Sequence, residues 1–141
     1  MPDSLERFVE AQDPVYDTVL SELAAGRKRS HWMWFVFPQL RGLGRSPMAH
    51  HFGLEGRTEA LGYWNHPVLG ARLRECIDLM LAVPDRSARD ILGSPDDTKL
   101  RSCLTLFESV APDDPRFDRA LARFYHGERD PLTLDMLAAD G

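Results

Sequence analysis

The stretch His66-Pro-Val-Leu-Gly-Ala-Arg-Leu-Arg-Glu-Cys-Ile-Asp-Leu-Met-Leu-Ala-Val83 decides the fold of this chain. After Pro67 its apolar residues recur with the 3.6-residue period of an α-helix. Proline is tolerated at the first helical position, because its missing N–H would have no partner inside the helix there. We therefore predict a helix over residues 67–83. Its apolar residues make it the best candidate for the core: Val68, Leu69, Leu73, Ile77, Leu79, Met80 and Leu81.

A proline that follows a capping or turn residue opens most of the other apolar patterns as well. Aspartate and serine before the proline can accept hydrogen bonds from the free N–H groups of the first helical turn. Asp3 and Glu6 form a capping box at the start of the chain. The five further dipeptides are Asp13-Pro14, Ser46-Pro47, Ser94-Pro95, Asp114-Pro115 and Asp130-Pro131. The expected helices cover residues 4–12, 14–25, 47–52, 58–65, 67–83, 87–92, 95–110, 115–125 and 131–138.

The chain shows no convincing alternation of apolar and polar residues of the kind that indicates a β-strand, apart from the β-prone run Trp34–Phe37. A length of 141 residues fits one domain. We therefore predict an all-α fold, a single domain over residues 1–141 with about eight or nine short helices around a central helix pair. The second helix of that pair is expected at 95–110, on the face that carries Leu100, Leu104, Phe107 and Val110.

Composition favours a protein of the cytoplasm. No apolar run approaches the ~20 residues needed to span a membrane, and the acidic N-terminal sequence does not look like a secretory signal. Cys76 and Cys103 lie inside helical patterns, which favours buried free thiols over a disulfide or a metal pair. His50 and His51 are adjacent, so on a helix their side chains diverge and do not share a metal in the usual way. We expect a protein that binds no metal, no cofactor and no membrane.

The net charge is −5, yet the 22 acidic residues are unevenly distributed. None of them lies between Leu23 and Leu54. We expect this window to form the main positive surface and to bind an anion, because its cations have no local carboxylate partners. Within it, the segment Arg27–Ser46, called the basic segment below, holds Arg27, Lys28, Arg29, Arg41 and Arg45.

The basic segment also carries two of the three tryptophans, Trp32 and Trp34. Ser30 is placed to cap a short helix over His31–Phe37. Gly42 and Gly44 then allow the backbone to approach another group closely. Arginine binds phosphate oxygens, a glycine-rich backbone can form an anion nest, and tryptophan offers a flat face. These features predict a phosphate-bearing small molecule with a stackable ring as the partner.

A second cluster, Ser94-Pro-Asp-Asp-Thr-Lys-Leu-Arg-Ser102, begins the helix expected at 95–110. Its two aspartates need no functional explanation, because the helix dipole favours carboxylates in the first turn. In the functional interpretation, Asp97 positions a water or holds an arginine, and Asp97 and His31 are the candidate catalytic residues. We predict that the loop at 41–44 packs against this helix start to form one pocket. The expected ligand-binding residues are Lys28, Arg29, Ser30, Trp32, Trp34, Gln39, Arg41, Gly42, Gly44, Lys99 and Arg101.

Much of the chain resembles the family catalogued as domain of unknown function 1810. The most specific part of this resemblance is Ser30-His-Trp-Met-Trp34. Members are sometimes labelled calpastatin, although nothing in this chain resembles a disordered protease inhibitor. The resemblance implies a compact helical domain and no particular activity. The resemblance covers nearly the whole chain, and the runs that carry it are Leu5–Tyr16, Gly26–Phe35, Phe37–Ser46, His66–Leu73 and Asp96–Phe107.

A fainter resemblance concerns residues Glu59–Leu73, which are similar to a helical stretch of the NADAR family. Members of that family are small helical proteins that cleave N-glycosides linked to ADP-ribose. The similarity is short and transfers no catalytic residue to this chain, so it serves as a lead to the class of ligand only.

Three functions remain open at this point. The first is binding or hydrolysis of a nucleotide or ADP-ribose-like ligand, which would act on an N-glycosidic linkage if it is catalytic. The second is an adaptor for a protein or acidic peptide, which requires a large exposed aromatic patch. The third is binding of RNA or single-stranded DNA, against which the net charge of −5 counts. A competing interpretation places the aromatic residues in the core, with the cations extending from its edge.

Overall fold

The computed structural model describes residues 5–140, and these form ten α-helices and no β-strand. One isolated parallel β-bridge joins Leu40 and Leu54. The predicted all-α fold is confirmed for the described residues. The helices are α1 (Glu6–Gln12), α2 (Tyr16–Ala24), α3 (Met33–Val36), α4 (Pro47–Phe52), α5 (Arg57–Asn65), α6 (Leu69–Ala82), α7 (Ala88–Leu92), α8 (Asp96–Val110), α9 (Pro115–Tyr125) and α10 (Pro131–Asp140).

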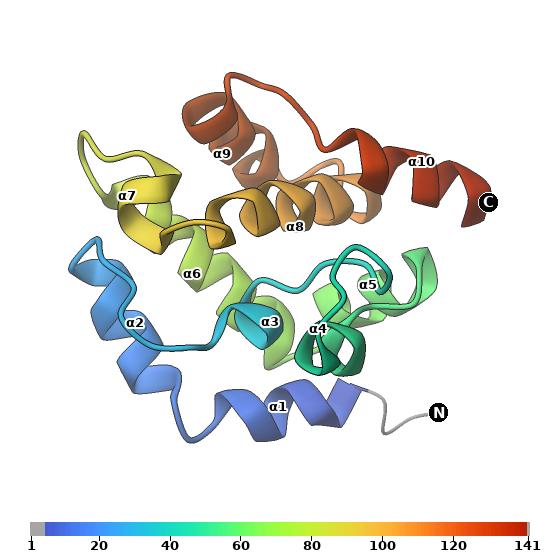
Figure 1. The fold of residues 1–141 in the computed structure, drawn as a ribbon, viewed down its shortest axis with the longest axis horizontal. Coiled ribbons are helices and arrows are strands. Elements are labelled where there is room, and N and C mark those ends of the chain that lie inside the picture. The colour runs from blue at the N-terminus through green and yellow to red at the C-terminus, as the bar shows by residue number, and fades with distance from the viewer. Residues whose placement is uncertain (1–4, 141) are drawn as a thin grey trace.

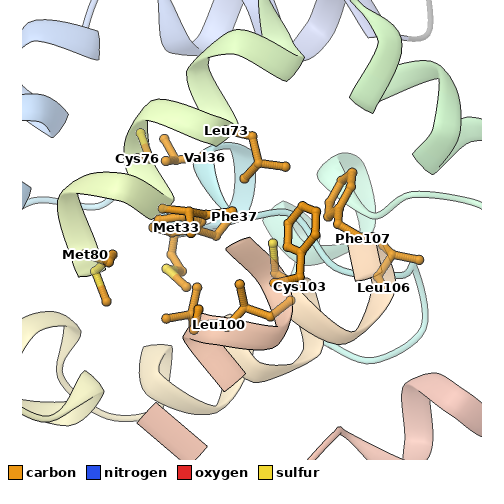
Figure 2. Packing of buried hydrophobic residues seen from close by; sticks show 14 of the residues in the cluster. Met33, Val36, Phe37, Leu73, Cys76, Met80, Leu100, Cys103, Leu106 and Phe107 are labelled. Carbon is orange, nitrogen blue, oxygen red and sulfur yellow. The ribbon is translucent and has the colours of Figure 1, made fainter. Parts of the chain in front are cut away.

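One hydrophobic core joins these helices. Helix α8 crosses the middle of the molecule, with α9 and α10 on one side of it and α3 and α4 on the other (Figure 1). Helix α6 packs against α2, α5 and α9. The side chains of Met33 and Phe37 lie between Leu73 of α6 and Leu100 of α8, so the α3 segment fills the space between the two central helices (Figure 2).

Three of the six helix starts predicted at prolines use the expected side chain as a cap. Ser46, Asp114 and Asp130 accept hydrogen bonds from the backbone N–H groups of Ala49, Arg116 and Thr133, respectively. His66 accepts from the N–H groups of Val68 and Leu69, but α6 begins only at Leu69, without a side-chain cap. Asp13 instead lies at the end of α1, and α2 begins only at Tyr16. Ser94 caps nothing, because α8 begins at Asp96 without a side-chain cap. Asp3 lies outside the described residues.

The β-prone run at 34–37 is part of the short helix α3 and of the residue that ends it. Cys76 and Cys103 are buried free thiols, as predicted. Within residues 5–140, every helix is too short or too polar to cross a membrane.

Candidate functional site

Glu22, on α2, holds the first part of the basic segment. Its carboxylate accepts hydrogen bonds from the backbone N–H groups of Arg29 and Ser30, at 2.9 and 3.2 Å. It also accepts from Ser30 Oγ at 2.7 Å and from the indole Nε1 of Trp32 at 2.8 Å. Burial alone would raise the pKa of this carboxyl, but the hydrogen bonds outweigh burial and lower the pKa to about 2. Ser30 and Trp32 are therefore used by the fold itself.

Acidic residues from outside the acid-free window neutralise part of it. Lys28 forms an ion pair with Asp96, and Arg41 forms one with Glu55. The expectation that the cations of the window lack carboxylate partners is therefore wrong for these two residues. Ion pairs among the described residues leave three cations of the basic segment unpaired and exposed: Arg27, Arg29 and Arg45.

Asp96, in the first turn of α8, binds two lysines. Lys28 Nζ lies 2.9 Å from Oδ2 of Asp96, and Lys99 Nζ lies 3.6 Å from Oδ1. Each ammonium also lies near an indole ring, 5.2 Å from the centroid of Trp32 for Lys28 and 5.5 Å from that of Trp34 for Lys99. The Lys28 side chain is only 8% exposed, whereas that of Lys99 is 25% exposed. Lys28 therefore belongs to the packed structure, and Lys99 stays accessible.

Two cavities lie on either side of Lys99, and Pro95 also lines both of them. Each is near the lower end of the ~300–1,000 Å³ range of small-molecule sites. The Trp34 cavity, of about 320 Å³, is lined by Lys28, His31, Met33, Trp34, Ser94, Pro95, Asp96 and Lys99. The Gln39 cavity, of about 310 Å³, is lined by Gln39, Leu43, Gly44, Pro95, Thr98, Lys99, Arg101, Ser102, Asp130 and Leu132.

Backbone contacts hold the walls of these cavities in place. Lys28 N–H donates to the C=O of Ile91 at 2.6 Å, which fixes the start of the basic segment against α7. The C=O of Gln39 accepts from Leu54 N–H at 3.0 Å, which fixes the loop before α4. A Cβ atom on Gly44 would lie 2.6 Å from the Cβ of Ala49. The close approach predicted at this glycine is therefore to helix α4.

Asp130 and Arg101 supply the charged wall of the Gln39 cavity. Asp130 is 6% exposed, and its Oδ2 accepts from Ser102 Oγ at 3.0 Å and from both the N–H and the hydroxyl of Thr133. Arg101 Nη2 lies 3.7 Å from Asp130 Oδ1, which is too far for a hydrogen bond. The Nε of Arg101 is buried and has no hydrogen-bond partner among the described residues. The Arg101 side chain is 30% exposed, so the donors that an acceptor from outside can reach are those of its Nη groups.

Asp97, the expected catalytic carboxylate, does not line either cavity. Its C=O accepts from the hydroxyl of Tyr125 on α9, and its Oδ1 is buried without a hydrogen-bond partner in the described residues. Burial, and then the nearby charge of Asp97, raise the pKa of the Tyr125 hydroxyl. The carboxylate that contacts the basic segment and lines the Trp34 cavity is that of Asp96. Neighbouring residues on a helix point about 100° apart, which separates the surroundings of these two aspartates.

The structure brings seven of the predicted site residues to the two cavities: Lys28, His31, Trp34, Gln39, Gly44, Lys99 and Arg101. From the loop at 41–44, Leu43 and Gly44 line the Gln39 cavity together with residues at the start of α8. Gly42 instead faces Met136, and Arg41 turns to another part of the molecule. The role of the seven residues in binding stays a prediction. Residues 5–140 hold no group of three or more side chains arranged to bind a metal ion.

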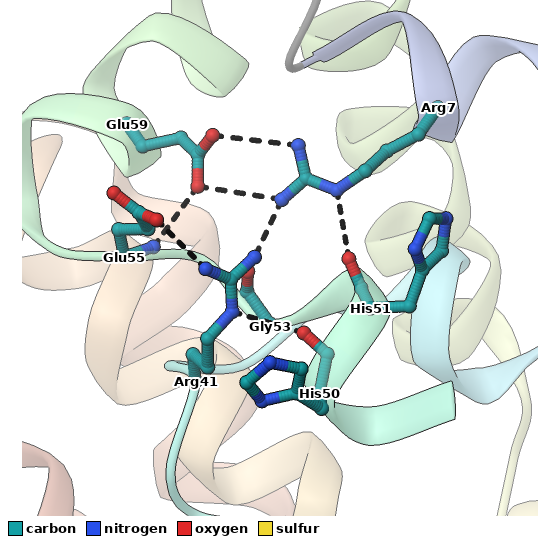
Figure 3. Close-up of polar contacts among 7 residues, drawn as sticks. All are labelled: Arg7, Arg41, His50, His51, Gly53, Glu55 and Glu59. Atoms are coloured by element: carbon teal, nitrogen blue, oxygen red, sulfur yellow. Dashed lines mark hydrogen bonds and ion pairs between the residues drawn. The ribbon is translucent and has the colours of Figure 1, made fainter. Parts of the chain in front are cut away.

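Arg41 belongs to a separate polar cluster with Arg7 and Glu55, called the Arg7–Arg41 cluster below, which the sequence did not indicate (Figure 3). Its Nη1 donates to Glu55 at 2.7 Å, and its Nε donates to the C=O of His50 at 2.9 Å. Arg7, from α1, donates through Nε to the C=O of His51 at 2.9 Å. The two arginines thus satisfy carbonyls at the C-terminal end of α4, where cationic side chains are stabilising.

A cavity of about 650 Å³ lies beside the Arg7–Arg41 cluster. Three arginines and three carboxylates line it, so neither sign of charge is in excess. Arg7 and Glu59 form an ion pair at 3.4 Å. They are 52 positions apart in the chain, and such a pairing leaves no local signal in the sequence. The charged residues that line the cavity are Arg7, Arg41, Arg57, Glu55, Glu59 and Asp140.

Comparisons with known proteins agree with this fold. A family model described as "Protein of unknown function (DUF1810)" matches residues 2–137, which confirms the resemblance that the sequence indicated. The chain is also similar to the crystal structure of the conserved hypothetical protein Rv1873 from Mycobacterium tuberculosis. The two share 51% sequence identity over 98% of this chain and 99% of the other, with a TM-score of 0.96. No curated protein matches the chain. The fainter likeness to the NADAR family stays a prediction.

Proposed function

Because the chain belongs to the DUF1810 family, whose description states no function, we propose a function from the two cavities: they bind an anionic small molecule that carries a phosphoryl group and a flat ring, such as a nucleotide. The observation that carries this proposal is the position of Lys99. Its ammonium lies 5.5 Å from the Trp34 ring centroid, and the same side chain lines the cavity that holds Arg101. One cation therefore adjoins both a stacking surface and an arginine.

The charge around the two cavities supports an anionic ligand. Three cations line them, Lys28, Lys99 and Arg101, against two carboxylates, Asp96 and Asp130. With His31 neutral, the balance is three minus two, or one positive charge, in a chain whose net charge is −5. A local positive site in an acidic protein attracts small anions.

The burial of the aromatic residues supports a small molecule over the two other partners considered. Trp32, Phe35 and Phe37 all belong to the hydrophobic core. Trp34 is only partly buried, and it lines the cavity beside Lys99. A single partly exposed ring inside a cavity suits stacking of one base. An adaptor surface or a single-strand binding groove calls for several exposed aromatic side chains.

Hydrolysis of the ligand stays a prediction. Of the two expected catalytic residues, His31 lines the Trp34 cavity together with Asp96, whereas Asp97 lies outside both cavities. The proposal therefore concerns binding, and any test of N-glycoside cleavage should begin with His31 and Asp96.

A thermal-shift screen with AMP and ADP-ribose tests the proposed function. A ligand at about 100 times its Kd adds about 2.7 kcal/mol to the free energy of unfolding, so we expect a clear rise in Tm. Lys99→Ala should raise the ligand concentration needed for the same rise by roughly tenfold, because a charged hydrogen bond contributes about 1.5–3 kcal/mol. Lys28 is less suitable, because removing one partner of a buried ion pair also destabilises the fold.

Arg45→Ala is the matched control for Lys99→Ala. Arg45 is an exposed cation of the same basic segment, but it lines neither cavity. Its replacement removes one positive charge and should leave the ligand response unchanged. Equal losses in the two variants would indicate general charge attraction in place of a site. The absence of any response to either compound in the wild-type protein would contradict the proposed function.

A further inference from the structure

We propose that the ligand binds with a fixed polarity, its phosphoryl group in the Gln39 cavity at Arg101 and its ring on Trp34 in the other cavity. This inference rests on the proposed function and adds to it which cavity takes which part of the ligand. It also names the ligand class, a phosphomonoester with one sugar between phosphoryl group and ring, as in a nucleoside 5′-monophosphate.

The Trp34 cavity is the weaker site for a phosphoryl group. Asp96 lines this cavity, and its carboxylate already neutralises Lys28 at 2.9 Å and lies 3.6 Å from Lys99. A phosphoryl group placed there would face this carboxylate at close range, and like charges repel. The cavity offers a ligand the indole ring of Trp34 and a hydrogen-bond acceptor in Asp96.

The Gln39 cavity is better suited to the phosphoryl group, although it also contains a carboxylate. Asp130 directs one oxygen to Ser102 and Thr133, which satisfies much of its hydrogen-bonding capacity inside the protein. The guanidinium of Arg101 donates no side-chain hydrogen bond to any described residue, and its closest contact to Asp130 is 3.7 Å. A guanidinium has five N–H donors in a planar fork that matches two phosphate oxygens. The Nη donors of Arg101 are therefore available for such a group.

The position of Lys99 between the two cavities indicates the size of the ligand. The side chain of Lys99 lines both cavities, and its ammonium lies 5.5 Å from the centroid of the Trp34 ring. A phosphoryl group that contacts the Lys99 ammonium would thus lie close to a base that stacks on Trp34. We infer that a linker of one ribose joins them, with Lys99 as a point charge on the phosphoryl group.

Isothermal titration calorimetry on the full chain with three probes tests the polarity. The probes are AMP, adenosine (a ring without phosphoryl group) and ribose 5-phosphate (a phosphoryl group without ring). Arg101→Gln should raise the Kd for AMP and for ribose 5-phosphate by roughly tenfold or more and leave that for adenosine within about twofold. Trp34→Leu should raise the Kd for AMP and for adenosine by about fivefold or more and leave that for ribose 5-phosphate unchanged.

Conservative variants separate these effects from damage to the fold. Arg101→Lys keeps the charge but loses the fork, so binding of ribose 5-phosphate should stay weak. Trp34→Phe keeps an aromatic ring at the edge of the core, beside the cavity, and should retain most of the affinity for adenosine. Arg45→Gln should bind all three probes like the wild type, and the Tm of every variant reports whether it is folded.

The outcomes distinguish the polarity from the proposed function. If AMP binds but the pattern is reversed, or each variant weakens all three probes equally, the polarity is wrong and the proposed function stands. If none of the three probes binds the wild-type protein, the proposed function is contradicted, and the polarity with it.

Discussion

Glu22 orders the basic segment at the scale of single residues. Its carboxylate accepts four hydrogen bonds from Arg29, Ser30 and Trp32. Trp32 is 1% exposed, so its indole N–H would be left without an acceptor inside the protein if Glu22 were removed. A buried donor without a partner costs about 1–3 kcal/mol. Glu22 thus fixes residues 29–32, and Trp34, which lines the Trp34 cavity, follows two residues later.

The pKa of Glu22 gives a pH-dependent test of this anchor. The pKa is lowered from an ordinary value of 4.5 to about 2, so the folded state binds a proton less readily than the unfolded state. The resulting stability is fully present above about pH 4.5 and is lost progressively as the pH falls toward about 2. Relative to Glu22→Gln, which does not titrate, the wild type should lose part of its advantage between about pH 5 and pH 3.

Urea unfolding of both proteins at several pH values measures this difference in the free energy of unfolding. Glu22→Gln keeps one acceptor oxygen and the shape of the side chain, so it should fold at neutral pH. A difference between wild type and variant that stays constant from about pH 5 to about pH 3 would show that the carboxylate charge does not stabilise the fold.

Helix starts show, at the scale of elements, how far local sequence signals reach. The Ser-Pro dipeptide predicts a capped helix at both Ser46 and Ser94. Ser46 Oγ accepts from Ala49 N–H at 3.0 Å, but Ser94 makes no such bond, because α8 begins two residues later. A Ser-Pro dipeptide supplies a side chain that can cap a helix, whereas the packing of the neighbouring segments decides whether the cap forms.

These two serines form a matched pair for a stability measurement. Ser46→Ala removes a cap and should lower the free energy of unfolding by about 1 kcal/mol. Ser94→Ala removes an exposed hydroxyl that caps nothing and should change the free energy of unfolding by less than about 0.5 kcal/mol. Chemical denaturation of both variants checks this. Equal losses would mean that Ser94 stabilises α8 in solution.

The same limit applies to the residues of the candidate site. The residue types were predictable, since the sequence indicated a tryptophan, a carboxylate and several cations in two clusters. The directions in which these side chains point were not predictable. The buried face of the four-residue α3 depends on contacts with α6 and α8, which come later in the chain. The fold therefore uses Trp32 and leaves Trp34 at the cavity, and it places Asp96 there in preference to Asp97. Ion pairs between distant residues, such as Arg7 with Glu59, were not predictable at all.

At the scale of the whole molecule, the two cavities exist only because three separate parts of the chain meet. The basic segment supplies Lys28, Trp34, Gln39 and Gly44, and residues 94–102 and 130–132 supply the remaining wall. Bringing together residues 28 and 130 requires the complete fold, so binding should be lost in one step with unfolding. Our central claim is that one anionic ligand with a ring spans these cavities.

The tryptophan side chains allow the most direct test of this claim. The chain has three of them, and each has a distinct position: Trp34 at the cavity, Trp32 bound to Glu22, and Trp64 stacked against Arg74 at 3.8 Å in another part of the molecule. We propose a titration with AMP followed through the three indole N–H signals in ¹H–¹⁵N correlation spectra. The account predicts a saturable shift of the Trp34 signal with little change at Trp32 and Trp64. A Trp34 signal that stays in place at high AMP, or equal shifts of all three signals, would contradict it.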